Sequence, residues 1–410
     1  MNRKPHVAVL PNLGLGHLIP QLEFAKRLVV HHGIHVSLLL ITTNEPSPAQ
    51  DQLLSSSHLP PDLHIVPLPP VEVDKKIIND GDVLVLTRIC VITDHSLRSL
   101  KSVLIALGKP NALVTDIFAT QAFDVCKELL IPTYVYVTTS AAFSAFMLYL
   151  PKLDSDVNCE FIDLSEPIQV PGCSPIRTHD LLDQARNRKI DEYKWLLHHF
   201  SRLPLASGIF VNSWKDLEPP PDSVIFVTFG SGGTLSFEQQ TELAWGLELS
   251  QQRFIWEVRK PTDSTGAGTF FNAGEANEND PKVYLPEGFL DRTQGGFLSH
   301  CGWNSVLESI VHGVPLVTWP LYAEQRMNST MLVEDIGVAI KPKMEAGQQT
   351  IVGRKEIERV VRMVMEGEEG KVIRSRVKEL KASATKELDS SGSSYESLSC
   401  VANYWKANHN

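Results

Sequence analysis

Short apolar runs alternate with helical patterns along the first half of this sequence. Continuous apolar runs predict strands that are buried on both faces, and their alternation with helices predicts a parallel sheet covered on both sides. Between the first two runs, residues Gln21 to Val30 have the spacing of an amphipathic helix. The predicted strands are His6 to Leu10, His35 to Ile41, Asn111 to Phe118, Thr133 to Thr138 and Gly208 to Ser213.

The same alternation restarts after three consecutive prolines, Pro219 to Pro221. Amphipathic patterns near the end of the chain predict further helices, the last of them ending near Trp405. Two doubly wound α/β halves predict a ligand-binding cleft at the carboxyl ends of their strands. The predicted elements of the second half are strands over Ser223 to Ser231, Arg253 to Val258, Phe297 to His300 and Pro315 to Pro320, and helices over Phe237 to Leu249 and Asn304 to Val311.

These patterns predict an N-terminal domain over 1–218, a linker over 219–222 and a C-terminal domain over 223–388. The final segment, 389–410, is expected to form a helix that packs back on the N-terminal domain. Four extended linker residues span at most about 14 Å. The tether between the two domains is therefore expected to be short.

Charge and composition exclude several classes of function. The net charge of −10 argues against a surface that binds nucleic acid. The stretch from Leu129 to Pro151 carries no charge and is long enough to span a membrane, but its Thr, Ser and Pro residues favour a buried strand followed by a helix. No secretory leader pattern precedes the first strand, and the six cysteines lack metal-binding spacing. We therefore expect a cytoplasmic protein with reduced cysteines and no membrane span.

A glycine-containing turn, Pro11 to Pro20, follows the first strand and places His17 at the start of a helix. The positive end of a helix lowers the pKa of an imidazole and favours the neutral form that a general base needs. A structural or capping histidine is the alternative interpretation. Gly14 and Gly16 resemble part of a dinucleotide-binding fingerprint, but the third glycine is absent, which makes a nicotinamide-dependent oxidoreductase a weak hypothesis.

Asp116 comes at the end of the apolar run that begins at Asn111. A carboxylate at the carboxyl end of a parallel strand faces the ligand cleft. If it reaches the far nitrogen of His17, it orients the imidazole and stabilises the imidazolium that forms when the base takes a proton. A cap for the following helix is the alternative interpretation.

A second candidate site lies between Gly295 and Gln325. A strand ending at His300 is followed by a Cys-Gly turn, and residues 303–305 open a helix. The backbone N–H groups at that helix start, together with Ser305 and His300, predict a site for a diphosphate. The turn from Phe229 to Gly233, which is rich in glycine and serine, predicts a second approach to phosphate.

Polar residues around this helix predict recognition of a sugar nucleotide. Glu308 lies one turn into the helix, where its carboxylate can accept two hydrogen bonds from ribose hydroxyls. Glu324 and Gln325 follow the next strand and can form hydrogen bonds with sugar hydroxyls.

The segment from Gly295 to Gln325 is similar to the nucleotide-sugar signature box of plant secondary-product UDP-glycosyltransferases. The resemblance extends along the whole chain. Within the family the sequence looks closest to the phenol-glucosylating group, of the hydroquinone glucosyltransferase type. The further segments that carry the resemblance are GHLIPQLEFAKRL, LVTDIFATQAFDV, PGC, DEYKWLLHH, GIFVNSW, SVIFVTFGSGGTLS and LPEGFLDRT.

The resemblance implies a GT-B fold, in which two Rossmann-like doubly wound α/β domains face a cleft. It also implies an inverting mechanism that needs no metal and no cofactor. By the same resemblance, His17 is the catalytic base and Asp116 is its partner. The residues implied for the donor are His300, Asn304, Ser305 and Ser231 for the diphosphate, Glu308 for the ribose, and Glu324, Gln325, Thr138 and Trp303 for the sugar.

Two segments of the family pattern have no counterpart in this chain. The family box begins with Trp-Ala-Pro-Gln and a His-containing stretch, whereas this chain passes from Thr293 almost directly to Gly295. The Trp that stacks on uracil, its neighbouring Gln and the preceding strand are therefore missing. Family members also have a long interdomain linker after the position of Glu218, where this chain has four residues. Both differences indicate lost segments.

The leading hypothesis is a monomeric enzyme that transfers glucose from UDP-glucose to the hydroxyl of a small phenolic acceptor, with inversion to a β-glucoside. The alternative is an impaired or inactive member of the family that binds UDP or phenolics only weakly. Release of UDP in the presence of a simple phenol distinguishes the two. The identity of the acceptor stays open, because its pocket is expected in variable loops such as 71–82 and 159–185.

Overall fold

The computed structural model of the chain describes residues 4–43, 48–56, 58–71, 84–171, 173–214, 216–217, 235–250, 299–343 and 351–407. The chain divides into two compact units. The first comprises residues 1–175, 184–212 and 395–410, and the second comprises 176–183 and 213–394. The predicted linker 219–222, the predicted strands Ser223 to Ser231 and Arg253 to Val258, and the predicted phosphate ligand Ser231 lie outside the described residues.

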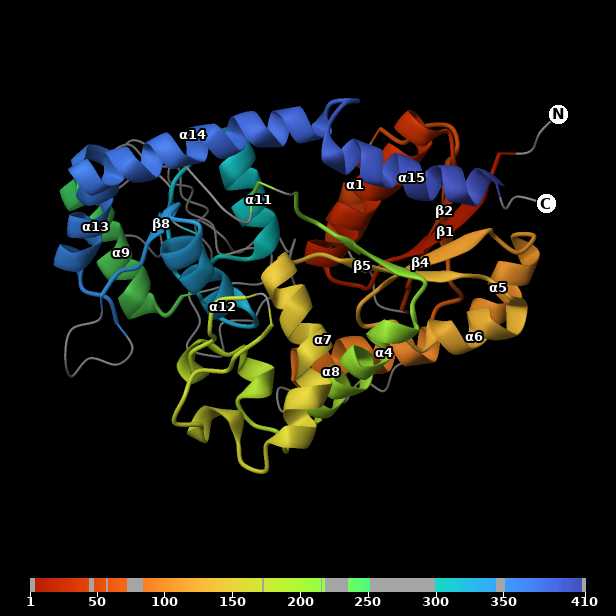
Figure 1. Cartoon of the computed structure of the whole chain (residues 1–410), viewed down its shortest axis with the longest axis horizontal. Helices are drawn as coiled ribbons and strands as arrows, with labels where there is room; N and C mark the ends of the chain where they lie inside the picture. The colour runs from red at the N-terminus through yellow and green to blue at the C-terminus, as the bar shows by residue number, and fades with distance from the viewer. Residues whose placement is uncertain are drawn as a thin grey trace. The chain divides into compact units, whose positions relative to one another are not determined.

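A parallel sheet forms the centre of the first unit (Figure 1). Its six strands are β1 (His6–Leu10), β2 (His35–Leu40), β3 (Leu63–Pro67), β4 (Ala112–Asp116), β5 (Thr133–Val137) and β6 (Gly208–Val211). Their order in space is β3-β2-β1-β4-β5-β6, so successive strands are added in opposite directions on the two sides of the β1–β4 pair. Such a sheet opens a crevice at the carboxyl ends of those two strands. The residues that end β4 and follow β1 therefore meet at one edge of the sheet.

Helices cover both faces of this sheet (Figure 1). In β1, Val7 and Val9 join the core beneath α1 and α15, whereas Ala8 and Leu10 point to the opposite face and join the core beneath α5 and α6. Burial on both faces explains why the strands are continuous apolar runs. The helices of this unit are α1 (Leu15–His32), α2 (Pro48–Ser56), α4 (Val85–Leu97), α5 (Leu100–Ala106), α6 (Ala122–Leu129), α7 (Ala141–Asp156), α8 (Asp191–Arg202) and α15 (Ser393–Ala407).

Several boundaries differ from those that the pattern predicts. β3 has no predicted counterpart, because exposed and half-buried positions interrupt its apolar run at the edge of the sheet. α1 begins at Leu15 rather than at Gln21. The uncharged stretch from Leu129 forms a strand followed by a helix, as predicted, and the Ser140 hydroxyl caps α7 by accepting a hydrogen bond from the Phe143 N–H (3.1 Å). In the part of the chain that is described, no helix has the length and apolar character needed to cross a membrane.

The second unit is mainly helical in its described part. Apolar side chains of α9 and α13 form its core together with β7 and β8, which pair in parallel. The predicted helical face of Ile357, Val360, Val361 and Val364 is buried there. The described elements are α9 (Phe237–Ser250), α11 (Trp303–His312), β7 (Leu316–Val317), α12 (Gln325–Thr330), a π-helical turn (Met331–Asp335), β8 (Ala339–Ile340), α13 (Arg354–Glu366) and α14 (Glu368–Leu388).

The segment 176–183 belongs to the second unit, although the residues on both sides of it belong to the first. Asp180 is almost fully buried and accepts hydrogen bonds from Arg177 Nε (2.8 Å) and Thr330 Oγ1 (2.9 Å). Arg326 of α12 forms an ion pair with Asp183. A single predicted boundary at 218 cannot describe this arrangement, because these partners lie far apart in the sequence.

Candidate active site

Asp116 is the last residue of β4 and is fully buried. It lies at the carboxyl ends of the central strands, where the crevice opens. Four donors surround its two carboxylate oxygens. Oδ1 accepts hydrogen bonds from the side-chain amide of Asn12 (2.9 Å) and from the backbone N–H of Phe118 (3.0 Å). Oδ2 lies 2.7 Å from Nδ1 of His17 and accepts from the side-chain amide of Gln21 (2.9 Å). A carboxylate has about four lone-pair positions, so the acceptor capacity of Asp116 is filled.

His17 reaches Asp116 from the first turn of α1. The carbonyl of Gly14, the N-cap residue, accepts from the backbone N–H of His17 (2.9 Å), which fixes the turn. Because Asp116 is the acceptor in the contact with Nδ1, that nitrogen carries the hydrogen and Nε2 carries the lone pair. The imidazole is 23% exposed. A half-buried imidazole in this tautomer can take a proton at Nε2.

Asn12 connects the turn that carries His17 to the strand that carries Asp116. Its side-chain oxygen accepts a hydrogen bond from the Gly14 N–H (2.7 Å), while its amide donates to Asp116. Thr138, predicted to contact the sugar, follows β5 and places its hydroxyl 3.3 Å from Nδ1 of His17. The structure thus brings the predicted residues His17, Asp116 and Thr138 together within the first unit.

Aromatic rings border the His17–Asp116 pair. The ring centroid of Phe118 lies 5.7 Å from that of His17 and 5.8 Å from that of His199 on α8. His199 is fully buried, its Nδ1 lies 2.9 Å from the hydroxyl of Thr120, and its ring stacks on Trp195. Burial, with a smaller effect of His198, lowers the pKa of His199 to about 3. The imidazole of His199 is therefore uncharged at physiological pH and contributes an aromatic surface beside Phe118.

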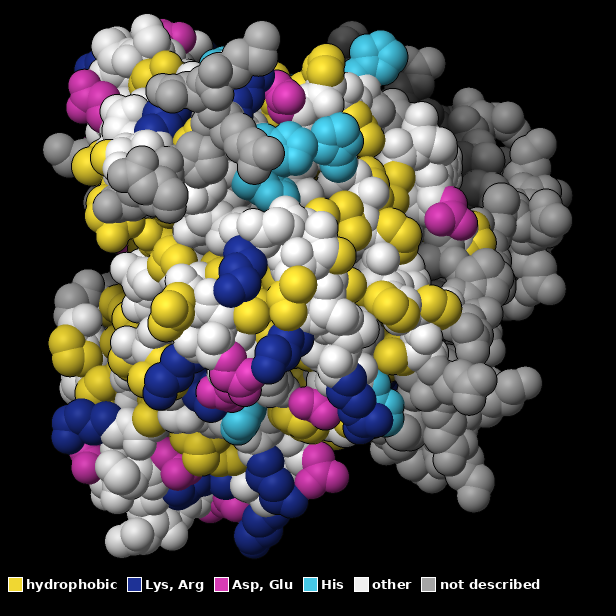
Figure 2. Space-filling model, turned by 90° about the vertical axis from the view of Figure 1, so that its right-hand side faces the viewer, with side chains coloured by type: hydrophobic (Ala, Val, Ile, Leu, Met, Phe, Trp, Pro, Cys, Tyr) yellow, Lys and Arg dark blue, Asp and Glu magenta, His cyan; other side chains and the backbone are white. Residues whose placement is uncertain are grey.

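Three other histidines lie at the amino ends of strands in the same sheet, at the end away from the crevice. Histidine side chains gather on the face that Figure 2 presents. The rings of His6, His35 and His64 form a row at the amino ends of β1 to β3, with centroids 4.6 Å and 4.9 Å apart. Burial is the main cause that lowers the pKa of His6 to about 4. This row is separate from the crevice, which opens at the carboxyl ends of the strands.

In the second unit, four of the predicted donor residues lie at or just before the start of α11: His300, Trp303, Asn304 and Ser305. Cys301 has a left-handed backbone (φ 66°), which is unfavourable for a residue other than glycine and is frequent at functional sites. Hydrogen bonds from its N–H to the Ser299 hydroxyl (3.1 Å) and from Asn328 to its carbonyl (2.9 Å) hold it there. A side chain at Gly302 would collide with the imidazole of His300. The turn therefore holds His300 next to the first residues of α11.

The first turn of α11 has the features of an anion site. Gly302 caps the helix and is followed by Trp303, Asn304 and Ser305. Backbone N–H groups at the start of a helix are directed outward along its axis, and the positive end of the helix favours negative charge. Glu308, one turn further along, is exposed, and partial desolvation by the surrounding protein raises the pKa of its carboxyl group. The indole of Trp303 is buried inside the unit, and its predicted contact with the sugar stays a prediction.

Glu324 and Gln325 stand at the start of α12. The side-chain oxygen of Gln325 accepts from the backbone N–H groups of Leu321 (2.8 Å) and Tyr322 (3.1 Å). This oxygen is therefore used to close the loop that precedes the helix, and the amide nitrogen is the group left to meet a sugar hydroxyl. Ala323, which directly precedes Glu324, has a left-handed backbone (φ 55°).

Comparison with known proteins gives the family. Residues 221–374 match a family model described as UDP-glucoronosyl and UDP-glucosyl transferase. The hydroquinone glucosyltransferase of Rauvolfia serpentina is 42% identical to this chain, and the alignment covers 99% of both. The chain belongs to the plant UDP-glycosyltransferase family.

Solved structures of relatives confirm the predicted GT-B fold of this glycosyltransferase. UGT2 of Phytolacca americana, complexed with UDP-2fluoro-glucose and pterostilbene, matches with a TM-score of 0.85 at 40% identity, over 98% of this chain and 99% of that chain. A UDP-glucosyltransferase from Polygonum tinctorium, capable of glucosylating indoxyl, was solved with 3,4-dichloroaniline. It matches with a TM-score of 0.86 at 40% identity, over 99% of both chains.

This glycosyltransferase is shorter than its relatives. The alignment with the Rauvolfia serpentina enzyme runs over 473 positions, more than the 410 residues of the chain. The relative therefore has residues that this chain lacks, in agreement with the two missing segments that the sequence indicates. Both places, around 219–222 and around 294, lie outside the described residues.

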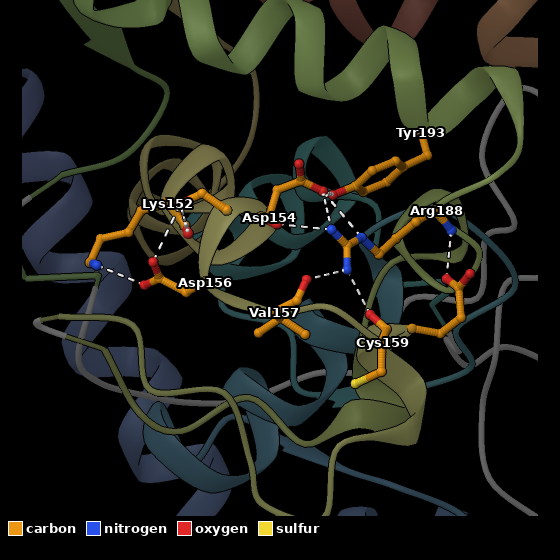
Figure 3. Close-up of polar contacts among 9 residues, drawn as sticks. Lys152, Asp154, Asp156, Val157, Cys159, Arg188 and Tyr193 are labelled. Atoms are coloured by element: carbon orange, nitrogen blue, oxygen red, sulfur yellow. Dashed lines mark hydrogen bonds and ion pairs between the residues drawn. The ribbon is translucent and has the colours of Figure 1, made fainter.

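The sequence interpretation missed an arginine that holds the loop beyond α7 (Figure 3). Arg188 donates to the carboxylate of Asp154 (2.8 and 3.1 Å) and to the carbonyls of Val157 and Cys159 (2.6 Å each). The Tyr193 hydroxyl donates to the same carboxylate. Asp154 belongs to α7, which begins just after Thr138. Tyr193 belongs to α8, which also carries His199. The carboxylate of Asp154 therefore connects α7 with α8 through Tyr193 and with the following loop through Arg188.

Asn12 and Gln21, which hold Asp116, were also not predicted. Gln21 could have been noticed, because it is a polar residue on the buried face of α1, between Leu18 and Leu22. Asn12 gives no such signal, because an asparagine before a glycine-containing turn is ordinary turn chemistry.

Proposed function

We propose that this glycosyltransferase transfers glucose from UDP-glucose to the hydroxyl of a small phenol, with inversion to a β-glucoside. The observation that carries the proposal is the 2.7 Å contact of His17 Nδ1 with a fully buried carboxylate of Asp116. This contact leaves Nε2 as the proton acceptor. The choice of a phenol rests on the hydroquinone glucosyltransferase among the relatives, since hydroquinone is a phenol.

In the proposed reaction, His17 Nε2 takes the proton of the phenolic hydroxyl as its oxygen attacks the anomeric carbon. The bond between that carbon and the diphosphate oxygen breaks, and UDP leaves with the electron pair. Attack from the side opposite the leaving group inverts the configuration. Asp116 keeps the imidazole in position and stabilises the imidazolium. The proton on His17 is then released to solvent.

The donor is assigned to the second unit in this proposal. His300, Asn304 and Ser305 hold the diphosphate at the start of α11, Glu308 binds the ribose, and Glu324 and Gln325 bind the sugar, with Thr138, Trp303 and Ser231 as further contacts. The positive end of a helix can stabilise the leaving diphosphate without a metal. Among the described residues, no group of His, Cys, Asp and Glu side chains could hold a metal ion. We propose, as the family resemblance implies, that neither a metal nor a cofactor takes part, and that transfer survives EDTA.

The proposal is tested with purified protein, UDP-glucose and hydroquinone, by measuring UDP release and the glucoside by mass spectrometry. His17→Ala should lower transfer by at least about 100-fold, the contribution typical of a general base. Its affinity for UDP should stay near that of the unmodified chain. His31→Ala, an exposed histidine at the other end of α1, is the matched control and should leave transfer unchanged. Equal transfer by His17→Ala would disprove the role of the base.

The proposal also places a monomeric enzyme in the cytoplasm. Size-exclusion chromatography with light scattering tests the first statement, and localisation of a fluorescent fusion tests the second. If the unmodified chain binds UDP but forms no glucoside from any phenol, the alternative of an inactive shortened member of the family is correct.

A further inference from the structure

Two side-chain amides are directed at the carboxylate of Asp116, one from each side. Asn12 donates to Oδ1 and Gln21 donates to Oδ2, each at 2.9 Å. All three side chains are buried, with Gln21 and Asp116 at 0% exposure. Water therefore does not replace either amide, and these contacts set how much negative charge Asp116 presents to His17.

Gln21 has a further feature that packing does not explain. Its side-chain oxygen is buried and has no hydrogen-bond partner among the described residues. Burying an amide oxygen without a partner is unfavourable, and an apolar side chain of similar size would avoid it. The neighbouring buried residues on this face of α1, Leu18 and Leu22, are apolar. The contact that Gln21 does make is the one from its amide nitrogen to Asp116.

Asn12 holds the carboxylate and the helix start at the same time. Its oxygen accepts from the Gly14 N–H at 2.7 Å and its nitrogen donates to Asp116. The orientation of the Asn12 amide is thus determined, because its oxygen faces a hydrogen-bond donor and its nitrogen faces an acceptor. The turn that positions His17 and the carboxylate that orients its ring are connected by one side chain.

We propose that Asn12 and Gln21 are positioning residues that reduce the electrostatic stabilisation of the His17 imidazolium by Asp116. By doing so they set the pH above which His17 is unprotonated and can act as the base. The inference rests on the proposed function, in which His17 is the base. Each amide hydrogen bond draws charge from the carboxylate. When one is removed, Oδ2 presents more negative charge to Nδ1, and the protonated imidazole becomes more stable. The base is then available only at a higher pH.

The titratable groups near His17 and Asp116 do not change charge in the pH range in which the proposed shift of His17 is measured. Among the described residues, Cys90 on α4 and His199 on α8 are titratable side chains from other elements that interact electrostatically with Asp116. Burial raises the pKa of Cys90 well above its ordinary value and lowers that of His199 to about 3. Both are therefore uncharged between pH 5 and pH 8. The groups contributed by β5 and by the segment after β4 are the Thr138 hydroxyl and the Phe118 ring, which do not titrate in this range.

Gln21→Met tests the inference, because methionine has a similar length and no hydrogen-bond donor. Two readouts are compared with the unmodified chain. The first is the NMR titration of the His17 imidazole in protein labelled at histidine, assigned by the signal that disappears in His17→Gln. The second is the acidic limb of kcat/KM for glucose transfer. Both midpoints should move to higher pH by about half a unit or more, a size that part of one hydrogen bond to a charged group can produce. KM for UDP-glucose should not change.

Gln240→Met is the matched control. Gln240 is also a buried glutamine with an amide atom that has no partner among the described residues, but it lies on α9 of the second unit. The same chemical change there should move neither midpoint. Asn12→Ser provides a second variant, since a hydroxyl can still accept from the Gly14 N–H, and it should move the midpoints in the same direction.

The two readouts separate the possible failures. An upward shift of the His17 titration in a chain that transfers no glucose would support the positioning role and refute the proposed function alone. An unchanged titration midpoint in Gln21→Met, or an equal shift in Gln240→Met, would refute the positioning role whether or not the chain is active.

Discussion

Trp405, in the last helix, lies edge-on against Tyr134 of β5, with ring centroids 5.3 Å apart and the rings at 82°. The indole is 1% exposed and belongs to the same core cluster as residues of β1, β2 and α1. Residues 395–410 therefore form part of the first unit, more than 180 positions after its preceding segment ends at Asn212. The C-terminal helix completes the hydrophobic core on one face of the six-stranded sheet.

Trp405→Ala should lower the free energy of unfolding by about 3–5 kcal/mol, because it leaves a large cavity under α15. Urea denaturation followed by circular dichroism measures the change. Tyr404→Ala, at the neighbouring and exposed position, is the control and should change the free energy of unfolding by no more than about 0.5 kcal/mol. A loss for Trp405→Ala as small as that expected for Tyr404→Ala would show that the docked helix contributes little to the first unit.

Asp116→Asn should reduce transfer, but less than His17→Ala does, because the base is retained. In the asparagine variant, an NH2 group replaces one carboxylate oxygen. This group cannot accept the hydrogen bonds that the oxygen accepts in the unmodified chain. Loss of the negative charge makes the imidazolium less stable, so the acidic limb of kcat/KM should move to lower pH. This direction is opposite to that expected for Gln21→Met. A pH profile with an unmoved acidic limb would contradict the electrostatic role of Asp116.

His199 should make the first unit less stable in acid. Its pKa is about 3 when folded, whereas an unfolded histidine has a pKa near 6.5. As the pH falls below 6.5, the unfolded chain binds a proton that the folded chain excludes, so stability falls by about 1.4 kcal/mol per pH unit until the pH approaches 3. Urea denaturation at pH 7 and pH 5 should show a smaller difference for His199→Phe than for the unmodified chain. Equal differences would mean that His199 takes up its proton in the folded state.

Arg188→Lys should loosen the loop that follows α7. A lysine keeps the charge, but its three N–H donors cannot replace the five hydrogen bonds that the planar guanidinium makes to Asp154, Val157 and Cys159. The free energy of unfolding should fall by about 1–3 kcal/mol, and limited proteolysis should cut faster within 157–187. The exposed neighbour Lys189 provides the control, since Lys189→Ala should alter neither measurement. Unchanged proteolysis of Arg188→Lys would contradict the role of this contact.

The shortened chain should transfer glucose weakly. Family resemblance implies a Trp that stacks on uracil, and such stacking is worth about 1–3 kcal/mol. Its absence weakens binding of UDP-glucose by roughly 5- to 150-fold. Inserting a segment of family length between Thr293 and Gly295, with a longer linker after Glu218, should restore transfer. If the unmodified chain already has the KM for UDP-glucose of full-length relatives, the missing Trp is dispensable.

The sequence by itself predicted five of the six strands of the first unit and named the residues that are proposed to carry the chemistry. β1, β2, β4, β5 and β6 were predictable because strands buried on both faces must be apolar throughout, which is a local property of the chain. His17 and Asp116 were predictable as candidates because each follows or ends such a strand. β3 was not, since an edge strand has exposed positions that interrupt the pattern.

Only the tertiary structure decided which of these residues meet. His17 and Asp116 are 99 positions apart, and they touch because β1 and β4 are neighbours at the centre of the sheet. Three of the four donors around Asp116, the contacts of Arg188 and the position of 176–183 in the second unit depend in the same way on partners distant in sequence. Periodicity reports whether a position is buried or exposed, but it does not say against which residue it lies. The role of a buried polar side chain such as Gln21 can be read only from the residue with which it forms a hydrogen bond, here Asp116.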